Sequence, residues 1–218
     1  MIRYIATLLF AFSAVALGAS GNISKVNSSI RVDDGGQAGD VSTVNGSITI
    51  GRNASVREVD TVNGSIRLDE RARAESVETV NGGVTLGEGV LVSEDVSAVN
   101  GKLTVQRGAR VGGRLENVNG QFLLEGATVG AGIETVNGDI VVGAGSRVDG
   151  GVTVEDSNSW KWRAKSRNPR LTIESGAVVN GPLRFEREVD LYLGDGAVIG
   201  PVEGVEPRRY TIGVADAG

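Results

Sequence analysis

The side chains that could do chemistry in this sequence are carboxylates, because its 218 residues include no His and no Cys. Imidazole general bases, thiolate nucleophiles and the common zinc sites are therefore excluded. Three adjacent acidic pairs could bind Ca²⁺ or exchange protons: Asp33-Asp34, Glu94-Asp95 and Glu155-Asp156. Neighbouring residues on a strand point to opposite faces, and no pair recurs at one position of the coil. We therefore expect solvated turn residues, with no catalytic residue, metal site or cofactor.

Aromatic and basic side chains gather in one segment, residues 155–170, with the sequence EDSNSWKWRAKSRNPR. This segment holds both Trp residues and five basic residues, whereas the whole chain has a formal net charge of −5. One interpretation is an exposed loop that binds an anion or a glycan by stacking and by charge. Its candidate ligand-binding residues are Trp160, Lys161, Trp162, Arg163, Lys165 and Arg167.

The alternative interpretation places both Trp side chains in the protein core. The stretch Ser159-Trp160-Lys161-Trp162 overlays Ser47-Ile48-Thr49-Ile50 in its pattern. The Trp pair would then fill the inward positions of a widened coil, because aromatic residues on an alternating strand are usually core residues. The sequence leaves both interpretations open.

A second basic stretch contains Arg107, Arg110 and Arg114. Its small intervening residues would allow a patch for phosphate or an acidic glycan. Glu116 and Glu125 lie close by in the sequence, however, and predict a solvated face of mixed charge.

The elements that position these residues follow from a repeated tripeptide, Val-Asn-Gly. It occurs at residues 44–46, 62–64, 80–82, 99–101, 118–120, 136–138 and 179–181. The first six copies follow one another at intervals of 18 or 19 residues. A fixed short period indicates stacked structural repeats, each covering the apolar face of its neighbour.

Each period contains three pairs of apolar residues, and the members of a pair are two or three positions apart, close to the two-residue period of a β-strand. After Asn45, for example, the pairs are Ile48 and Ile50, then Ala54 and Val56, then Val59 and Val62. Three short strands per period predict a triangular coil. The fold is therefore expected to be all-β: a single-stranded parallel β-helix, or β-solenoid, of about ten triangular coils of 18–19 residues.

Two alternatives bear on this fold. Asn-Gly also favours β-hairpins, but an antiparallel meander would need such a turn after every strand. The step Gly194–Pro201 is similar to left-handed hexapeptide helices. Right-handed coils are favoured over left-handed ones, because parallel crossovers are right-handed by strong default.

Val-Asn-Gly is predicted to form one corner of each coil. Val would point inward at the end of a strand, Asn would tolerate left-handed angles, and Gly would adopt a positive φ. Asn side chains at equivalent corners could also bond to one another along the rod. The predicted turn residues are Asn45, Gly46, Asn63, Gly64, Asn81, Gly82, Asn100, Gly101, Asn119, Gly120, Asn137 and Gly138.

The chain is expected to divide into a signal peptide, residues 1–19, and a β-solenoid domain, residues 20–218, with an irregular insertion or widened coil at 153–170. Arg3, an apolar run and small residues around Ala19 form the secretory pattern. Loss of Arg3 leaves a net charge of −6, which disfavours nucleic acid as a partner. The expected location is the periplasm or the cell surface, with membrane contact only through the signal sequence before cleavage.

The motif Val-x-x-Val-Asn-Gly-x-Ile-x-Leu, as at Val59–Leu68, resembles the adhesin-like β-helical domain of bacterial envelope proteins. This resemblance covers residues 23–154. The later stretch Ser-Gly-Ala-Val-Val-Asn-Gly-Pro-Leu, at 175–183, is similar to the bactofilins. Bactofilins are polymer-forming scaffold proteins that normally lack a secretory signal, whereas this chain carries one. The resemblances imply a β-helical scaffold and supply no catalytic residues.

These observations predict an exported, non-enzymatic β-solenoid with a structural or adhesive role in the bacterial envelope. Its expected partners are a second copy, through the open coil ends, or an envelope polysaccharide. The alternative function is an envelope glycan-binding module that uses residues 160–170. A glycan-cleaving enzyme is disfavoured, because it needs carboxylates and basic residues clustered on one face.

Overall fold

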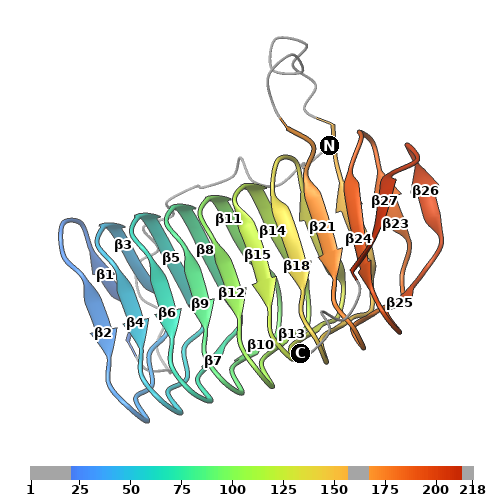
Figure 1. The fold of residues 1–218 in the computed structure, drawn as a ribbon. Coiled ribbons are helices and arrows are strands. Elements are labelled where there is room, and N and C mark those ends of the chain that lie inside the picture. Colours follow the sequence, from blue (N-terminus) through green and yellow to red (C-terminus); the bar gives the residue numbers. More distant parts are fainter. Residues whose placement is uncertain (1–20, 157–166, 213–218) are drawn as a thin grey trace, which may run out of the picture.

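The computed structural model describes residues 21–156 and 167–212. All regular elements in these two ranges are β-strands, which stack in parallel into a rod with three faces (Figure 1). Each coil passes from one sheet to the next before it returns one layer further along. The prediction of a parallel, triangular β-solenoid is confirmed, while its right-handed winding stays a prediction.

The first sheet, sheet A, contains ten strands. In order along the rod they are β1 (Ile23–Lys25), β3 (Val41–Asn45), β5 (Glu58–Asn63), β8 (Ser76–Asn81), β11 (Val96–Asn100), β14 (Arg114–Asn119), β17 (Gly132–Thr135), β20 (Val152–Val154), β23 (Leu183–Phe185) and β26 (Val202–Gly204). Ten stacked strands correspond to nine coil-to-coil steps.

The second sheet, sheet B, also contains ten strands and follows sheet A within each coil. Its strands are β2 (Ile30–Val32), β4 (Ile48–Ile50), β6 (Ile66–Leu68), β9 (Val84–Leu86), β12 (Leu103–Val105), β15 (Gln121–Leu124), β18 (Asp139–Val142), β21 (Arg170–Ile173), β24 (Asp190–Gly194) and β27 (Arg208–Ile212).

The third sheet, sheet C, is formed by seven shorter strands. They are β7 (Arg73–Ala74), β10 (Leu91–Val92), β13 (Arg110–Val111), β16 (Thr128–Val129), β19 (Arg147–Val148), β22 (Val178–Val179) and β25 (Val198–Ile199). Single parallel bridges, Gln37 with Ser55 and Ser55 with Arg73, extend this face toward the first coils.

The core is a set of apolar columns inside the triangle. Ile48 lies in register with Ile66, which lies in register with Val84, and all three are at most 1% exposed. Every buried side chain of this size contributes about 1.5–3 kcal/mol to folding. Stability therefore comes from stacking many equivalent small side chains, as the sequence predicted.

The corner formed by Val-Asn-Gly joins sheet A to sheet B, but its Val does not point inward as predicted. Thr61, one residue earlier, is 2% exposed, and its Oγ1 donates to the carbonyl oxygen of Gly46 at 3.1 Å. Val62 is half-buried on the outer face of the sheet. A hydroxyl group is favoured at this inward position because it donates a hydrogen bond to a buried carbonyl group in the corner of the preceding coil.

The glycine of each corner is also needed for a different reason than the one predicted. None of Gly46, Gly64, Gly82, Gly101, Gly120 and Gly138 has a positive φ. A Cβ atom on Gly64 would instead overlap the carbonyl oxygen of Gly46 in the coil beneath. The Asn-Gly corners stack so closely that there is no room for a side chain at this position.

Left-handed backbone occurs at the next corner, where sheet B leads to sheet C. The positive φ values there belong to Asn53, Arg71, Gly35, Gly89, Gly108, Gly126, Gly145, Gly176 and Gly196. In most coils a tight turn closes around this residue, as where the Ala72 amide donates to the Asp69 carbonyl at 3.1 Å. The positive-φ prediction was thus assigned to the wrong corner.

The Asn side chains of the first corner form a continuous ladder. Each Nδ2 donates to the Oδ1 of the Asn one coil earlier, from Asn45 onto Asn27 at 2.8 Å to Asn137 onto Asn119 at 3.1 Å. The ladder ends at Asn137, whose Oδ1 accepts from Arg187 at 2.8 Å. The predicted bonding between equivalent Asn residues is confirmed.

The seventh Val-Asn-Gly lies at a different corner. Val179 belongs to β22 in sheet C, and the chain then enters β23 in sheet A. Asn180 Nδ2 donates to Asp149 Oδ1 at 2.7 Å, not to the ladder. The tripeptide sequence alone therefore does not determine which corner of a coil it occupies.

Candidate ligand-binding site beside the chain break

The segment with the two Trp residues interrupts the rod at the corner where earlier coils carry Asn-Gly. β20 in sheet A ends at Val154, and β21 in sheet B begins at Arg170. Leu171 and Ile173 fill the inward positions equivalent to Ile48 and Ile50. The overlay of Trp160 and Trp162 on the pattern of Ile48 and Ile50 stays a prediction, because both Trp residues lie outside the described ranges. Of the six predicted ligand-binding residues, Trp160, Lys161, Trp162, Arg163 and Lys165 lie outside the described residues.

Arg167, the sixth predicted residue, is described and lies on the outer surface beside sheet B. Its two terminal nitrogens donate to the carboxylate of Asp139 at 2.9 and 2.6 Å, while its side chain stays 71% exposed. Burial acts to raise the pKa of Asp139, but hydrogen bonds from Arg167 and the Arg170 amide outweigh it and lower this pKa. Arg167 is thus oriented by a bidentate ion pair at the edge of the break.

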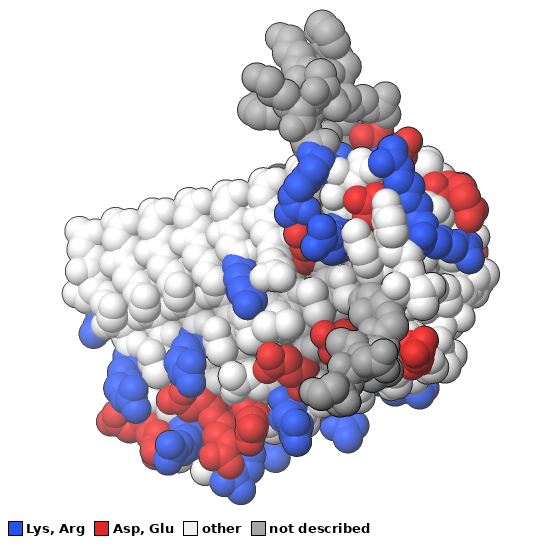
Figure 2. Space-filling model, in the orientation of Figure 1, with Lys and Arg blue, Asp and Glu red and all other residues white. Residues whose placement is uncertain are grey.

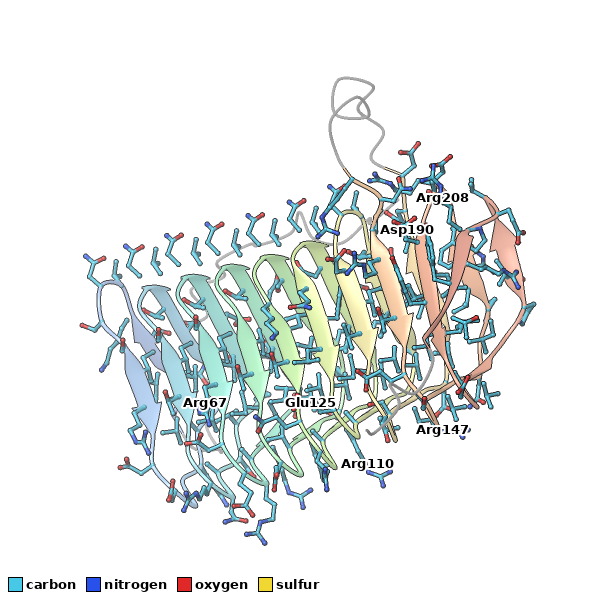
Figure 3. The ribbon with its side chains drawn as sticks, viewed as in Figure 1. Arg67, Arg110, Glu125, Arg147, Asp190 and Arg208 are labelled. Carbon is cyan, nitrogen blue, oxygen red and sulfur yellow. The ribbon has the colours of Figure 1, made fainter. Side chains whose placement is uncertain are left out.

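A column of alternating charge continues from this pair along sheet B. Arg170 stands in register with Asp190, and Asp190 with Arg208. Arg208 also pairs with Glu188 at 3.2 Å. Figure 2 shows basic side chains gathered on this part of the rod, and Figure 3 shows Asp190 and Arg208 together on it.

Two tyrosines, which the sequence analysis did not single out, lie beside this column. The rings of Tyr192 and Tyr210 stack with centroids 4.6 Å apart, and the guanidinium of Arg170 lies 5.1 Å from the Tyr192 centroid. Tyr192 occupies an outward position between the inward-facing Leu191 and Leu193. An outward aromatic residue on an alternating strand was the signal that could have identified it.

Sheet A carries a second group of polar side chains, which the sequence analysis also missed. Asp60 is in register with Glu78, and Glu116 with Glu134, on the outer face of the sheet. Burial is the first cause that raises the pKa of all four, to about 7 for Asp60 and for Glu134. The sequence feature that could have identified this group is an acidic residue three positions before the Asn of Val-Asn-Gly, which occurs in four of the coils.

A cavity of about 310 Å³ lies at the end of this acidic column, next to the interruption of the repeat between Val154 and Arg170. It spans the strands β14, β17, β20 and β23 on the sheet A face. Its lining residues are Arg114, Ala131, Gly132, Ile133, Glu134, Gly150, Gly151, Thr153, Glu155, Arg184 and Glu186. β20 ends at Val154 in sheet A and β21 begins at Arg170 in sheet B, so this cavity and the group formed by Arg170, Tyr192 and Tyr210 lie on two sides of one corner.

The acidic pairs that the sequence pointed out behave differently from one another. Asp34 and Asp95 accept backbone amides in turns, at 2.9 Å from Arg52 and 2.7 Å from Arg114. Glu155 is only 7% exposed, so the expectation of a solvated turn residue is wrong for it. It is one of the residues that line the cavity.

The second basic stretch does not form one patch. Arg110 lies in sheet C, whereas Arg114 lies in sheet A, where it reaches Glu134 at 3.6 Å and Glu116 at 3.8 Å. Arg107 occupies the turn between sheets B and C. The prediction of a mixed-charge surface describes Arg114 correctly.

Comparison with protein-family models, curated proteins and solved structures found no match. The resemblance to adhesin-like domains and bactofilins therefore rests on the motifs alone. Within residues 21–156 and 167–212, no group of three or more acidic side chains is arranged to hold a metal ion. The same ranges contain no helix of the length and apolarity needed to cross a membrane.

Proposed function

We propose that this protein is an exported, non-catalytic rod of the bacterial envelope that binds an acidic glycan near its C-terminal end. The supporting observation is the position of the interruption in the repeat, between the end of β20 at Val154 and the start of β21 at Arg170. It lies at the corner where earlier coils carry Asn-Gly, and the described residues next to it include exposed Arg167 and Arg170 and the stacked Tyr192 and Tyr210. Guanidinium groups bind carboxylates, sulfates and phosphates through paired donors, and tyrosines supply flat contact area.

The regular coils before the break fit the role of a spacer. The Asn ladder and three stacked sheets tie each coil to the next through backbone and side-chain hydrogen bonds. Such an array is a stiff rod, and it holds a surface site at a fixed distance from the rod's other end. An adhesive role needs both parts, a stiff support and a recognition surface.

A second candidate function, self-association through the coil ends, has its own support. β1 and β2 each pair with one strand, so one edge of each lacks a strand partner among the described residues. Asn27 accepts from Asn45, but its own Nδ2 has no partner within the described part of the chain. Open strand edges recruit further chains, and a second copy would extend both the sheets and the ladder.

Binding to polygalacturonate, a carboxylate-bearing polysaccharide, tests the first proposal. We expect Arg167→Ala and Arg170→Ala each to weaken binding about tenfold, the effect of losing one charge-assisted hydrogen bond. Arg67→Ala is the matched control, because Arg67 is an outward residue of sheet B that pairs with Asp69 at 2.8 Å. Equal binding by all three variants would contradict the proposal.

Filament or oligomer formation tests the second candidate. Static light scattering and negative-stain microscopy of the exported chain would reveal it directly. We expect end-to-end assemblies that shorten when Asn27→Asp places a negative charge at the open ladder end. A monomer at all concentrations would contradict self-association without bearing on glycan binding.

A further inference from the structure

The seven Asn-Gly pairs of the chain share one chemical reactivity. When the backbone amide nitrogen of the glycine loses its proton, it can attack the side-chain carbonyl carbon of the preceding Asn, because glycine has no Cβ to hinder the approach. An N–H group that donates a hydrogen bond resists this loss, and a side-chain amide that is bonded to its neighbours cannot turn toward the nitrogen. The hydrogen bonds around each pair therefore determine whether it reacts.

The ladder corners restrain both reacting groups in five of the pairs. Four glycine amides donate to the Asn carbonyl oxygen of the next coil at distances between 2.9 and 3.1 Å: those of Gly46, Gly64, Gly82 and Gly101. The Gly138 amide donates to Thr135 Oγ1 at 2.9 Å. The Asn side chains of these five pairs are bonded along the ladder. Reaction at these corners therefore requires the coil to open first.

The pair Asn119-Gly120 is restrained only through its side chain. Within the described part of the chain, the Gly120 amide has no hydrogen-bond acceptor. Asn119 Nδ2 donates to Asn100, and its Oδ1 accepts from Asn137, both at 3.1 Å. The ladder thus fixes this side-chain amide from both sides, although the neighbouring backbone nitrogen is available.

The pair Asn180-Gly181, which lies outside the ladder, is the least restrained of the seven. The Gly181 amide has no acceptor among the residues that the structure describes. Asn180 is exposed, and its side chain makes one hydrogen bond in the same ranges, from Nδ2 to Asp149 Oδ1 at 2.7 Å. Neither the nucleophilic nitrogen nor the carbonyl group of this pair is held as it is in the ladder.

We propose that Asn180 is a site of self-modification by deamidation. The Gly181 nitrogen gives its proton to water or hydroxide and forms a bond to the side-chain carbon of Asn180. The bond from that carbon to Nδ2 breaks, and ammonia leaves with a proton from the solvent, so that a cyclic imide remains. Water then opens the ring at either carbonyl group and leaves an aspartate or an isoaspartate. The reaction needs water alone and does not depend on the proposed function.

The products disturb the corner that joins β22 in sheet C to β23 in sheet A. Asp149 accepts from Asn180 and from Arg147 Nε, the latter at 2.8 Å, so a carboxylate in place of the Asn180 amide removes a donor and repels Asp149. Isoaspartate also lengthens the backbone where a Cβ on Gly181 would already overlap Gly150. Deamidation therefore weakens the attachment of the coils from β23 onward.

Peptide mapping by mass spectrometry, on the full chain kept folded at mildly alkaline pH, tests this inference. We expect Asn180 to react about tenfold or more faster than any Asn of the ladder, because the ladder must open locally before it reacts. Asn119 is the matched control within the same molecule, since the Gly120 amide is equally free. In denaturant, where these hydrogen bonds are absent, the seven pairs should react at similar rates.

Two results would overturn the proposal. One is reaction of Asn119 or another ladder Asn as fast as Asn180 in the folded chain. The other is an intact Asn180 in the folded chain after the denatured chain has reacted. Circular dichroism before and after incubation establishes that the chain stays folded.

The variant Asn180→Asp tests the structural consequence separately. We expect its melting temperature to fall by about 2–5 °C, because the new carboxylate repels Asp149. Adding Asp149→Asn should restore most of this loss, since it removes the opposing charge. A variant Asn180→Asp as stable as the unmodified chain would contradict the expected weakening of the corner.

Discussion

At the scale of single residues, the corner glycines show how a correct sequence pattern can have an unexpected cause. The repeat correctly marked Gly46 and Gly64 as corner residues. Their role depends on a contact between coils, the approach of each glycine to a carbonyl oxygen in the coil beneath. Such contacts involve residues 18 or 19 positions apart, so local turn rules could not reveal them.

Substitution of Gly64 separates the two explanations. We expect Gly64→Ala to destabilise the protein by about 2 kcal/mol or more, because the new Cβ overlaps backbone atoms that cannot rotate away. Gly176→Ala is the control, since Gly176 has a φ of 71° but no atom near its Cβ position. Its cost should be about 1 kcal/mol, measured by chemical denaturation. A larger loss for Gly176→Ala would contradict the close-approach explanation.

The Asn ladder gives a second test at this scale. Asn81 donates to Asn63 at 3.0 Å and accepts from Asn100 at 3.0 Å, so Asn81→Asp removes one donor from the interior of the ladder. We expect a loss of about 1–2 kcal/mol in denaturant titration. Asn27→Asp keeps the acceptor that Asn45 uses and should cost much less. Similar losses for both variants would argue against a cooperative ladder.

At the scale of strands, the sequence predicted the repeat period correctly, but it did not always predict which side chains of a strand face the core. The pairs Ile48 and Ile50, and Ile66 and Leu68, were correctly assigned inward because alternation leaves no other choice for them. Thr61 and Val62 are both β-branched and adjacent, so the pattern favoured the more apolar of the two. The buried hydrogen bond to Gly46 reversed that assignment, and it is visible only when coils are stacked.

The acidic column on sheet A makes protein stability depend on pH. Asp60 rises from a pKa of 3.8 to about 7 because of burial, followed by repulsion from Glu78. A carboxyl group with a raised folded-state pKa stabilises the fold below its unfolded pKa and loses this contribution as pH rises through about 7. Asp139 has a lowered pKa, so its contribution is present at both pH 5 and pH 8.

We therefore expect the melting temperature to be several degrees, about 3–8 °C, higher at pH 5 than at pH 8. Asp60→Asn and Glu134→Gln should each reduce this difference, because neither amide titrates. Glu88→Gln, in an exposed turn, is the control and should preserve it. Differential scanning calorimetry provides the measurement. A melting temperature that rises from pH 5 to pH 8 would contradict the assigned pKa directions.

At the scale of the whole molecule, the rod and its break have separate roles. The sequence predicted both the stacked coils and residues 155–170 as the place where the period fails. It did not reveal that the two sides of the break carry the Arg170–Tyr192 contact and the Glu134–Glu155 cavity. Those groups come from several coils, and only their stacking brings them together.

The most direct test of the account is to replace the break with a regular corner. Exchanging residues 156–169 for Asn-Gly would give this coil the spacing of Thr135–Ile140. The account predicts that the variant still unfolds cooperatively and no longer binds polygalacturonate, whereas Arg67→Ala binds normally. Undiminished binding by the folded variant would show that recognition lies elsewhere on the rod and would contradict the proposed function.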